Sequence, residues 1–176
     1  GKRILIIRMN LLVLVLLIVV ATFAYAGLRG APWVPTRGHD LERFLKLADI
    51  KPGQKVYDLG CGDGRIVCAA AKAGAQAQGF EISLLPYFFA KIRSLFCPSG
   101  GSCKIRYRDF WNVNLGDADV VYFFLMQKCY PKLKEKLERE LKPGTKVIAY
   151  VWPIAGWTPV AVDTAKGYPP MYLYKI

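Results

Sequence analysis

Residues 55–64 read KVYDLGCGDG, and this stretch decides the fold. Residues 55–59 are expected to form a short strand, which runs into a turn with three glycines. Residues 65–73 then form a helix of small residues that ends at Gly74. A glycine-rich turn between a strand and a helix lets a ligand approach the backbone closely. The spacing lacks the last glycine of the G-x-G-x-x-G dinucleotide fingerprint, and the absence of Gly-Lys-Ser/Thr excludes a phosphate cradle of the P-loop kind.

Strand-like and helix-like segments alternate along the rest of the chain. Helices are expected at 40–49, 65–73, 84–96 and 128–141, and strands at 55–59, 75–81, 103–107, 119–125, 145–152, 160–163 and 171–176. The run DVVYFFL at 119–125 is apolar, as in a central parallel strand covered on both faces. This alternation predicts an α/β fold with a Rossmann-like, doubly wound, mostly parallel seven-stranded sheet that ends in a C-terminal β-hairpin.

Three acidic residues stand at the ends of three successive predicted strands. Asp58 closes the first strand, Glu81 closes the second, and Asp109 follows the third with Phe110 behind it. Singly, such acids are more often helix caps or solvated loop residues. Together, beside a turn without phosphate-binding groups, they suit a nucleoside that carries an amino-acid tail. Asp58 would face an ammonium group, Glu81 the two ribose hydroxyls and Asp109 an adenine amino group, with an aromatic ring against the base.

The N-terminus carries a long apolar segment. Residues 11–27 read LLVLVLLIVVATFAYAG without a charge, close to the roughly 20 residues that an α-helix needs to cross a hydrocarbon core. We therefore predict one transmembrane helix, with residues 1–30 as a membrane anchor and residues 31–176 as a single further domain. A cleaved signal peptide, with Ala24-Tyr25-Ala26 before the cleavage point, is the main alternative. A buried core helix is disfavoured because the remaining chain could hardly surround it.

The excess of basic over acidic residues limits the classes of partner that the protein is expected to bind. The 25 Lys and Arg residues exceed the 13 Asp and Glu residues. With an anchor beside the domain, we expect this basic surface to face anionic lipid rather than nucleic acid. Basic residues flank the apolar segment on both sides, so the positive-inside rule does not decide its orientation.

The cysteines suggest neither a disulfide framework nor a metal site. They are Cys61, Cys68, Cys97, Cys103 and Cys129. Their number is odd, no C-x-x-C pair occurs, and the chain has one histidine to help them bind a metal. We expect reduced cysteines in a single-pass membrane protein whose domain faces the cytosol, or another compartment supplied with its cofactor.

Several strings carry a family resemblance. DLGCGDGRIV at 58–67, GFEIS at 79–83 and RDFW at 108–111 are similar to the successive cofactor motifs of class I S-adenosylmethionine-dependent methyltransferases. With PWVPT at 32–36 and ELKPGTKVIAYVWPIAGWTP at 140–159, the chain resembles one group among them. These are the membrane-anchored protein-lysine methyltransferases that act on the ATP synthase c-subunit and the adenine nucleotide translocase, with their prokaryotic relatives. The resemblance implies S-adenosyl-L-methionine as the cofactor.

The resemblance also implies roles for individual residues. Pro35 and Thr36 would close over the methionine end of the cofactor. No general base is recognisable, so no catalytic residue is nominated. The remaining cofactor contacts carry over to Asp58, Gly60, Cys61, Gly62, Gly64, Glu81, Asp109 and Phe110.

The acceptor is predicted from the resemblance and from aromatic residues. After the fourth strand the chain reads FLMQ, without the Asn/Asp-Pro-Pro-Tyr/Phe signature of enzymes that methylate adenine or glutamine. A lysine of a membrane or membrane-proximal protein is favoured. Its ammonium would enter a channel lined by aromatic residues, although aromatics in strands are more often core. The candidates are Trp33, Tyr122, Phe124 and Trp152. A lipid, quinone or other hydrophobic small molecule is the first alternative, and a non-catalytic cofactor-binding membrane protein the second.

Overall fold

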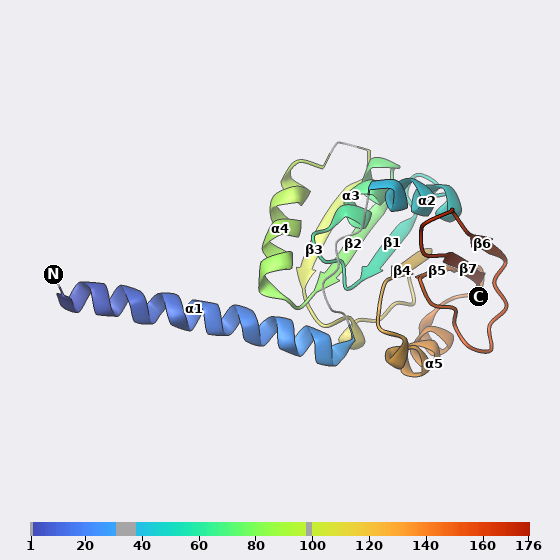
Figure 1. Ribbon diagram of the computed structural model, residues 1–176. Helices are drawn as coiled ribbons and strands as arrows, with labels where there is room; N and C mark the ends of the chain where they lie inside the picture. Colours follow the sequence, from blue (N-terminus) through green and yellow to red (C-terminus); the bar gives the residue numbers. More distant parts are fainter. Residues whose placement is uncertain (1, 31–37, 98–99) are drawn as a thin grey trace.

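A seven-stranded sheet forms the centre of the protein (Figure 1). The computed structural model describes residues 2–30, 38–97 and 100–176. The strands lie in the order β3-β2-β1-β4-β5-β7-β6. Their bounds are Lys55–Leu59 (β1), Gln76–Glu81 (β2), Ser102–Tyr107 (β3), Val120–Phe123 (β4), Lys146–Tyr150 (β5), Ala161–Asp163 (β6) and Met171–Lys175 (β7). β1 to β5 are parallel, whereas β7 runs antiparallel to β5 and β6. The predicted Rossmann-like sheet with a C-terminal hairpin is confirmed.

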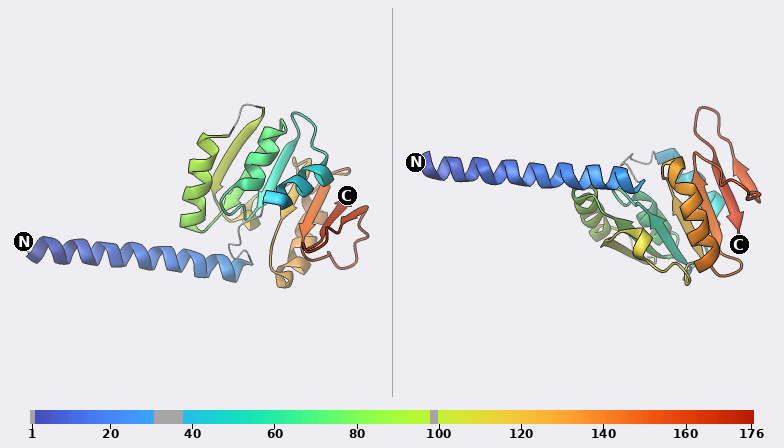
Figure 2. Two further views of the ribbon diagram at one scale, coloured as in Figure 1. Left: turned by 45° about the horizontal axis from the view of Figure 1, so that its top comes forward. Right: turned by 90° about the horizontal axis from the view of Figure 1, so that it is seen from below.

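Helices cover both faces of the sheet. α2, α3 and α4 pack on one face and α5 on the other, while α1 projects away from the domain (Figures 1 and 2). Their bounds are Lys2–Arg29 (α1), Gly38–Ala48 (α2), Arg65–Lys72 (α3), Leu84–Leu95 (α4) and Tyr130–Glu140 (α5), with short 3₁₀ helices at Phe110–Asn112 (η1) and Gln127–Cys129 (η2). The predicted helices and strands agree with these bounds to within two residues at either end.

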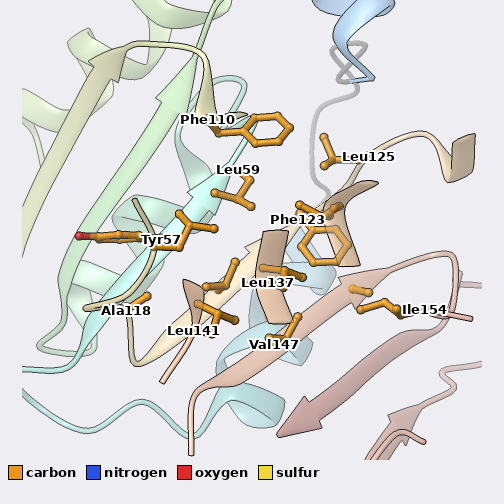
Figure 3. Close-up of a cluster of buried hydrophobic side chains, with 14 of the residues drawn as sticks. Tyr57, Leu59, Phe110, Ala118, Phe123, Leu125, Leu137, Leu141, Val147 and Ile154 are labelled. Atoms are coloured by element: carbon orange, nitrogen blue, oxygen red, sulfur yellow. The ribbon is translucent and has the colours of Figure 1, made fainter. Parts of the chain in front are cut away.

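The central strand β4 buries all of its side chains. Val121 and Phe123 face the core beneath α5, whereas Val120 and Tyr122 face the core beneath α2 and α3. Figure 3 shows Phe123 in the first of these cores, close to Leu137 of α5. A strand covered on both faces has no polar side, which explains the continuous apolar run in the sequence.

A buried ion network ties α2 to the C-terminal hairpin. The Arg43 guanidinium pairs with Asp40 of its own helix at 2.9 Å and with Asp163 of β6 at 2.6 Å. It also donates to the Pro169 carbonyl at 2.8 Å, and the Tyr150 hydroxyl donates to Asp40 at 2.9 Å. Since a buried charge is tolerated only when it is paired and hydrogen-bonded, this network fixes the hairpin against the domain.

The cysteines differ from the prediction. Cys68 in α3 and Cys97 after α4 form a disulfide, with Cα atoms 5.7 Å apart, and the sulfur of Cys103 in β3 lies 3.5 Å from that of Cys68. The prediction of reduced cysteines without a disulfide is therefore wrong. These three sulfur atoms lie within 4.8 Å of one another, but Cys68 and Cys97 could bind a metal only as thiolates, after reduction of the disulfide. Sequence spacing concealed the cluster because α3, β3 and the end of α4 meet only in the folded protein.

α1 is long, apolar and largely exposed. It is long and apolar enough to cross a bilayer, and its most apolar window is not buried by the described domain. The alternative of a buried core helix is therefore wrong. Only the last turns contact the domain, where Ala26 is buried and the Thr22 hydroxyl accepts the Leu84 N–H at 3.3 Å.

The disulfide yields a stability prediction. In a Cys103→Ser background, which removes the third thiol, Cys97→Ser should lower the free energy of unfolding by about 3–4 kcal/mol. The reason is that the disulfide joins residues 29 apart in sequence and restricts the unfolded chain. Denaturant titration followed by circular dichroism measures the change.

Two controls sharpen this measurement. Cys129→Ser removes a free cysteine and should have a much smaller effect in the same background. A reductant should abolish the difference made by Cys97→Ser, and a difference that persists in reductant would contradict a role for the disulfide.

Candidate cofactor site

The sheet reverses its order between β1 and β4, which lie side by side although β2 and β3 come between them in sequence. Ligands of open α/β sheets bind at the carboxyl ends of the strands at such a switch point. The glycine-rich loop, residues 60–64, leaves β1 there, and the segments after β2, β3 and β4 begin at the same side. We call this side the carboxyl edge and take it as the candidate site.

Glu81 holds the glycine-rich loop at the carboxyl edge. Its Oε2 accepts the Gly62 N–H at 2.9 Å, and its Oε1 accepts the N–H groups of Ile82 at 2.8 Å and Ser83 at 2.7 Å. Burial raises the pKa of Glu81, and these backbone hydrogen bonds oppose the rise. A carboxylate has about four acceptor positions, so Oε2 retains room for one further donor.

The loop lies so close to the sheet and to α4 that two glycines are required. Gly64 has a φ of +77°, and a Cβ there would lie 3.1 Å from that of Ala90. At Gly79 in β2, a Cβ would lie 2.6 Å from the sulfur of Cys61 and 2.7 Å from Val67. This role of Gly79 was not predicted, although a glycine inside a strand is a signal of close backbone approach.

Asp58 is a buried acid without a counter-charge among the described residues. It is 3% exposed, and within residues 2–30, 38–97 and 100–176 no group donates a hydrogen bond to its carboxylate. Burial raises the pKa of Asp58 well above its usual value, and the negative charges of Glu81 and Asp63 add to the rise. A buried acid in this state favours a cationic or hydrogen-bond-donating ligand.

Asp63 fastens the other side of the loop. Its carboxylate pairs with Arg65 at 2.8 Å and with Arg93 of α4 at 3.0 Å, and Arg93 also donates to the Asp63 carbonyl at 2.9 Å. This contact could not be predicted from the sequence, because nothing in the spacing of Asp63 and Arg93 indicates that α4 returns to the loop.

Asp109 lies after β3 as predicted, but protein groups already contact both of its oxygens. Oδ1 accepts the Trp111 N–H at 3.0 Å and so caps η1, while Oδ2 pairs with Arg29 at the end of α1 at 2.6 Å. Phe110 is 3% exposed and lies near Leu59 in the apolar cluster beneath α5 (Figure 3). The adenine contacts assigned to Asp109 and Phe110 therefore stay predictions, beside these structural roles.

The predicted channel aromatics fall in different environments. Tyr122 is 2% exposed and packs edge to face against Phe44 at 5.1 Å, in the core beneath α2. Phe124 follows β4 and packs against Tyr150 at 5.0 Å, whereas Trp152 follows β5 and is 42% exposed. Three further predicted residues lie outside the described part of the chain: Trp33, Pro35 and Thr36.

The carboxyl edge suits a nucleoside with a cationic amino-acid tail. The glycine-rich loop offers backbone without side chains, Glu81 keeps an acceptor position, and the carboxylate of Asp58 has no partner among the described groups. These features fit S-adenosylmethionine, which carries ribose hydroxyls, an ammonium group and a sulfonium.

Fold and site together define the class I S-adenosylmethionine-dependent methyltransferases. A solved RNA methyltransferase from Salinibacter ruber, in complex with S-adenosyl-L-homocysteine, is 31% identical and superposes with a TM-score of 0.76. The match covers 81% of this chain and 94% of that one. The predicted class and cofactor are confirmed.

The family follows from the sequence comparisons. A model of the ANTKMT methyltransferase domain matches residues 58–161, and the chain belongs to this family. A protein-lysine N-methyltransferase from Saccharolobus islandicus is 37% identical over 82% of this chain and 93% of its own length. The rat lysine N-methyltransferase of the ATP synthase c-subunit is 36% identical over 78% of this chain. This chain spans 65% of the length of the rat enzyme.

Removing the charge of Glu81 should weaken cofactor binding. Glu81→Gln keeps the size of the side chain but replaces one acceptor oxygen by a donor group, so the loop and the ribose lose a charge-assisted partner. We expect a loss of about 1.5–3 kcal/mol for S-adenosylmethionine and its demethylated product, a tenfold to hundredfold change. Calorimetric titration measures it. Glu135→Gln, at an exposed position of α5, is the matched control, and unchanged affinity in a folded Glu81→Gln variant would contradict the site.

Cofactor binding should also depend on the protonation of Asp58. Because its pKa is raised, this carboxyl takes up a proton at a higher pH than an ordinary aspartate does, and a cationic ligand lowers the pKa because it favours the charged form. Affinity should therefore fall as the pH falls, with proton release that makes the binding enthalpy depend on the buffer. Asp58→Asn should remove this dependence. An affinity that rises toward acidic pH would show that Asp58 does not face a cation.

Proposed function

We propose that the protein transfers methyl groups from S-adenosylmethionine to lysine side chains of a membrane or membrane-proximal protein. In this proposal residues 1–30 are a single-pass membrane anchor and residues 31–176 are the catalytic domain. Asp58, Glu81 and the loop at 60–64 bind the cofactor at the carboxyl edge.

The observation that carries the proposal is the docking of α1 at this edge. Arg29 pairs with Asp109 at 2.6 Å, and the indole N–H of Trp111 donates to the Arg29 carbonyl at 3.3 Å. The Gly30 carbonyl accepts the N–H of Met126, just beyond β4, at 2.8 Å. An apolar helix that ends at the carboxyl edge, against the segments after β3 and β4, would hold the methyl donor next to the membrane. A lysine near the bilayer surface is then the acceptor within closest reach.

The names of the relatives support a lysine acceptor. The relative from S. islandicus, most of whose length the chain covers, is named a protein-lysine N-methyltransferase. The names of the rat relative and of a mouse adenine nucleotide translocase lysine N-methyltransferase also give lysine as the methylated residue. The chain spans 65% and 57% of these two mammalian proteins, so we carry over the acceptor group but not their particular substrates.

Methyl transfer depends more on the positions of the two reactants and on the exclusion of water than on a strong base. Methyl transfer from a sulfonium is an in-line displacement, and the attacking lysine must be neutral, although its ordinary pKa is about 10.4. Apolar surroundings lower the pKa of an amine because they penalise its charged form. At the end of β4, Leu125 is buried and Phe124 packs against Tyr150. These apolar groups would exclude water beside the methyl donor.

We place the domain in a compartment that supplies S-adenosylmethionine, with the cytosol as the first choice. The Cys68–Cys97 disulfide removes the argument from reduced cysteines, because disulfides are rare in the cytosol. The proposed compartment is therefore argued only from the need of the domain for S-adenosylmethionine.

A labelling experiment tests the function. Incubation of the full chain with cofactor carrying a tritiated methyl group, together with membranes, should label a protein band that protease removes. Amino-acid analysis of the band should give methylated lysine. Asp58→Asn should reduce the label strongly, whereas the exposed control Glu135→Gln should not. Label that extracts into organic solvent would instead select a lipid or quinone, and label in RNA would select a nucleic acid. Cofactor binding without any label would select a non-catalytic protein.

A further inference from the structure

α4 turns its bulky apolar side chains away from the domain. Pro86 and Ala90 face inward and are buried. The outward side chains recur at helical spacing and range from 40% to 80% exposed. They are Leu85, Phe88, Phe89, Ile92, Leu95 and Phe96, which we call the α4 stripe. Contiguous exposed apolar surface of this kind marks an interaction site.

The packing of the domain explains why the large residues cannot face inward. A Cβ at Gly64 would lie 3.1 Å from the Cβ of Ala90 and 3.3 Å from the Cδ1 of Ile105, so the glycine-rich loop and β3 leave no room under α4 for a larger side chain. The contacts of α4 with the sheet are complete without the α4 stripe. The stripe is therefore available for something outside the described domain.

α1 and α4 lie on the same side of the domain, so both could face one membrane. α4 lies on the side of the domain from which α1 projects, and it runs across the direction of α1 (Figures 1 and 2). The Leu84 N–H at the start of α4 donates to the Thr22 hydroxyl at 3.3 Å. If α1 crosses a bilayer, α4 extends along the plane of that bilayer rather than into the solvent beyond it.

The length of α1 shows where the start of α4 would lie relative to a bilayer that α1 crosses. A hydrocarbon core of about 30 Å corresponds to 20 helical residues. If the core begins beside Arg3, it ends near Phe23; if it begins beside Arg8, it ends near Leu28. In the first case Thr22 lies at the boundary, and in the second it lies about 9 Å inside. Its contact with Leu84 therefore brings the start of α4 to the boundary of the hydrocarbon core in the first case and below that boundary in the second.

The charges around the α4 stripe favour an anionic lipid surface. Residues 84–108 contain no Asp or Glu, and their charged residues are Lys91, Arg93, Lys104, Arg106 and Arg108. Lys91 is exposed on α4 itself. Lys104 and Arg106 are also exposed, but they point to the opposite face of the edge strand β3, because Ile105 between them lies under α4. An exposed apolar stripe on a segment whose charged residues are all basic is compatible with a helix that lies in the interface of an anionic membrane.

We propose that α4 is an interfacial helix, with the α4 stripe inserted into the anionic phospholipid surface of the membrane that α1 crosses. This inference rests on the proposed membrane anchor and goes beyond it. A single helix would leave the domain free to rotate about its anchor, whereas two contacts fix its orientation. The carboxyl edge then faces the membrane at a constant angle, which restricts the acceptor to lysines close to the headgroups.

The test measures the depth of the α4 stripe with the full chain in vesicles of anionic phospholipid. Phe88→Trp places a fluorophore at a site that is 57% exposed, and Val160→Trp places one at a site that is 62% exposed, before the distant strand β6. Lipids brominated near the headgroup end of their acyl chains quench a tryptophan at that depth. The emission of each variant is compared with that of wild type, flotation reports membrane association, and cofactor binding reports folding.

Each outcome decides the proposal. Flotation with loss of the added emission in Phe88→Trp, but not in Val160→Trp, is the expected result. Flotation without selective quenching would overturn the interfacial helix and leave the anchor standing. A blue-shifted but unquenched tryptophan at residue 88 would show that a protein covers the α4 stripe, which also overturns the proposal. Failure of the wild type to float would remove the anchor, and the interfacial helix with it.

Discussion

The hydrogen bonds of the Glu81 carboxylate are the constraint on which the site depends. One side chain accepts N–H groups from Gly62, Ile82 and Ser83, so it joins the glycine-rich loop to the end of β2 and to the start of α4. Each N–H group would otherwise need another partner, because an unpaired buried donor costs roughly 1–3 kcal/mol. The loop proposed to contact the cofactor is thus held by the acid that was expected to contact the ribose.

A second constraint couples the anchor to the site. Arg29 is at the end of α1, and its partner Asp109 follows β3 at the carboxyl edge. Asp109 also caps η1 through the Trp111 N–H. A displacement of α1 would therefore disturb the segment after β3. α1 and the carboxyl edge are therefore in direct contact, although the boundary predicted at residue 30 separates them in sequence.

The sequence predicted the strands and helices well because their signals are local. The apolar run that became β4 and the glycines after β1 can each be read within a few residues. Contacts between distant segments could not be read in this way. The disulfide joins Cys68 to Cys97, and its formation depends on how α4 returns past α3. Tyr122 was expected in a channel, yet side chains alternate along a strand, and its register places it against Phe44 in the core.

The acids at the carboxyl edge show why the site favours a cation. Asp58, Glu81 and Asp63 are all buried, and Asp58 is repelled by the other two. Backbone donors stabilise Glu81, and two arginines stabilise Asp63. Asp58 has no such partner among the described residues. Burial of a carboxylate is unfavourable unless opposite charge accompanies it, so the energetic cost of Asp58 falls when a positively charged ligand binds. Asp58 therefore lowers the stability of the free protein, and a cation bound at the carboxyl edge would offset that loss.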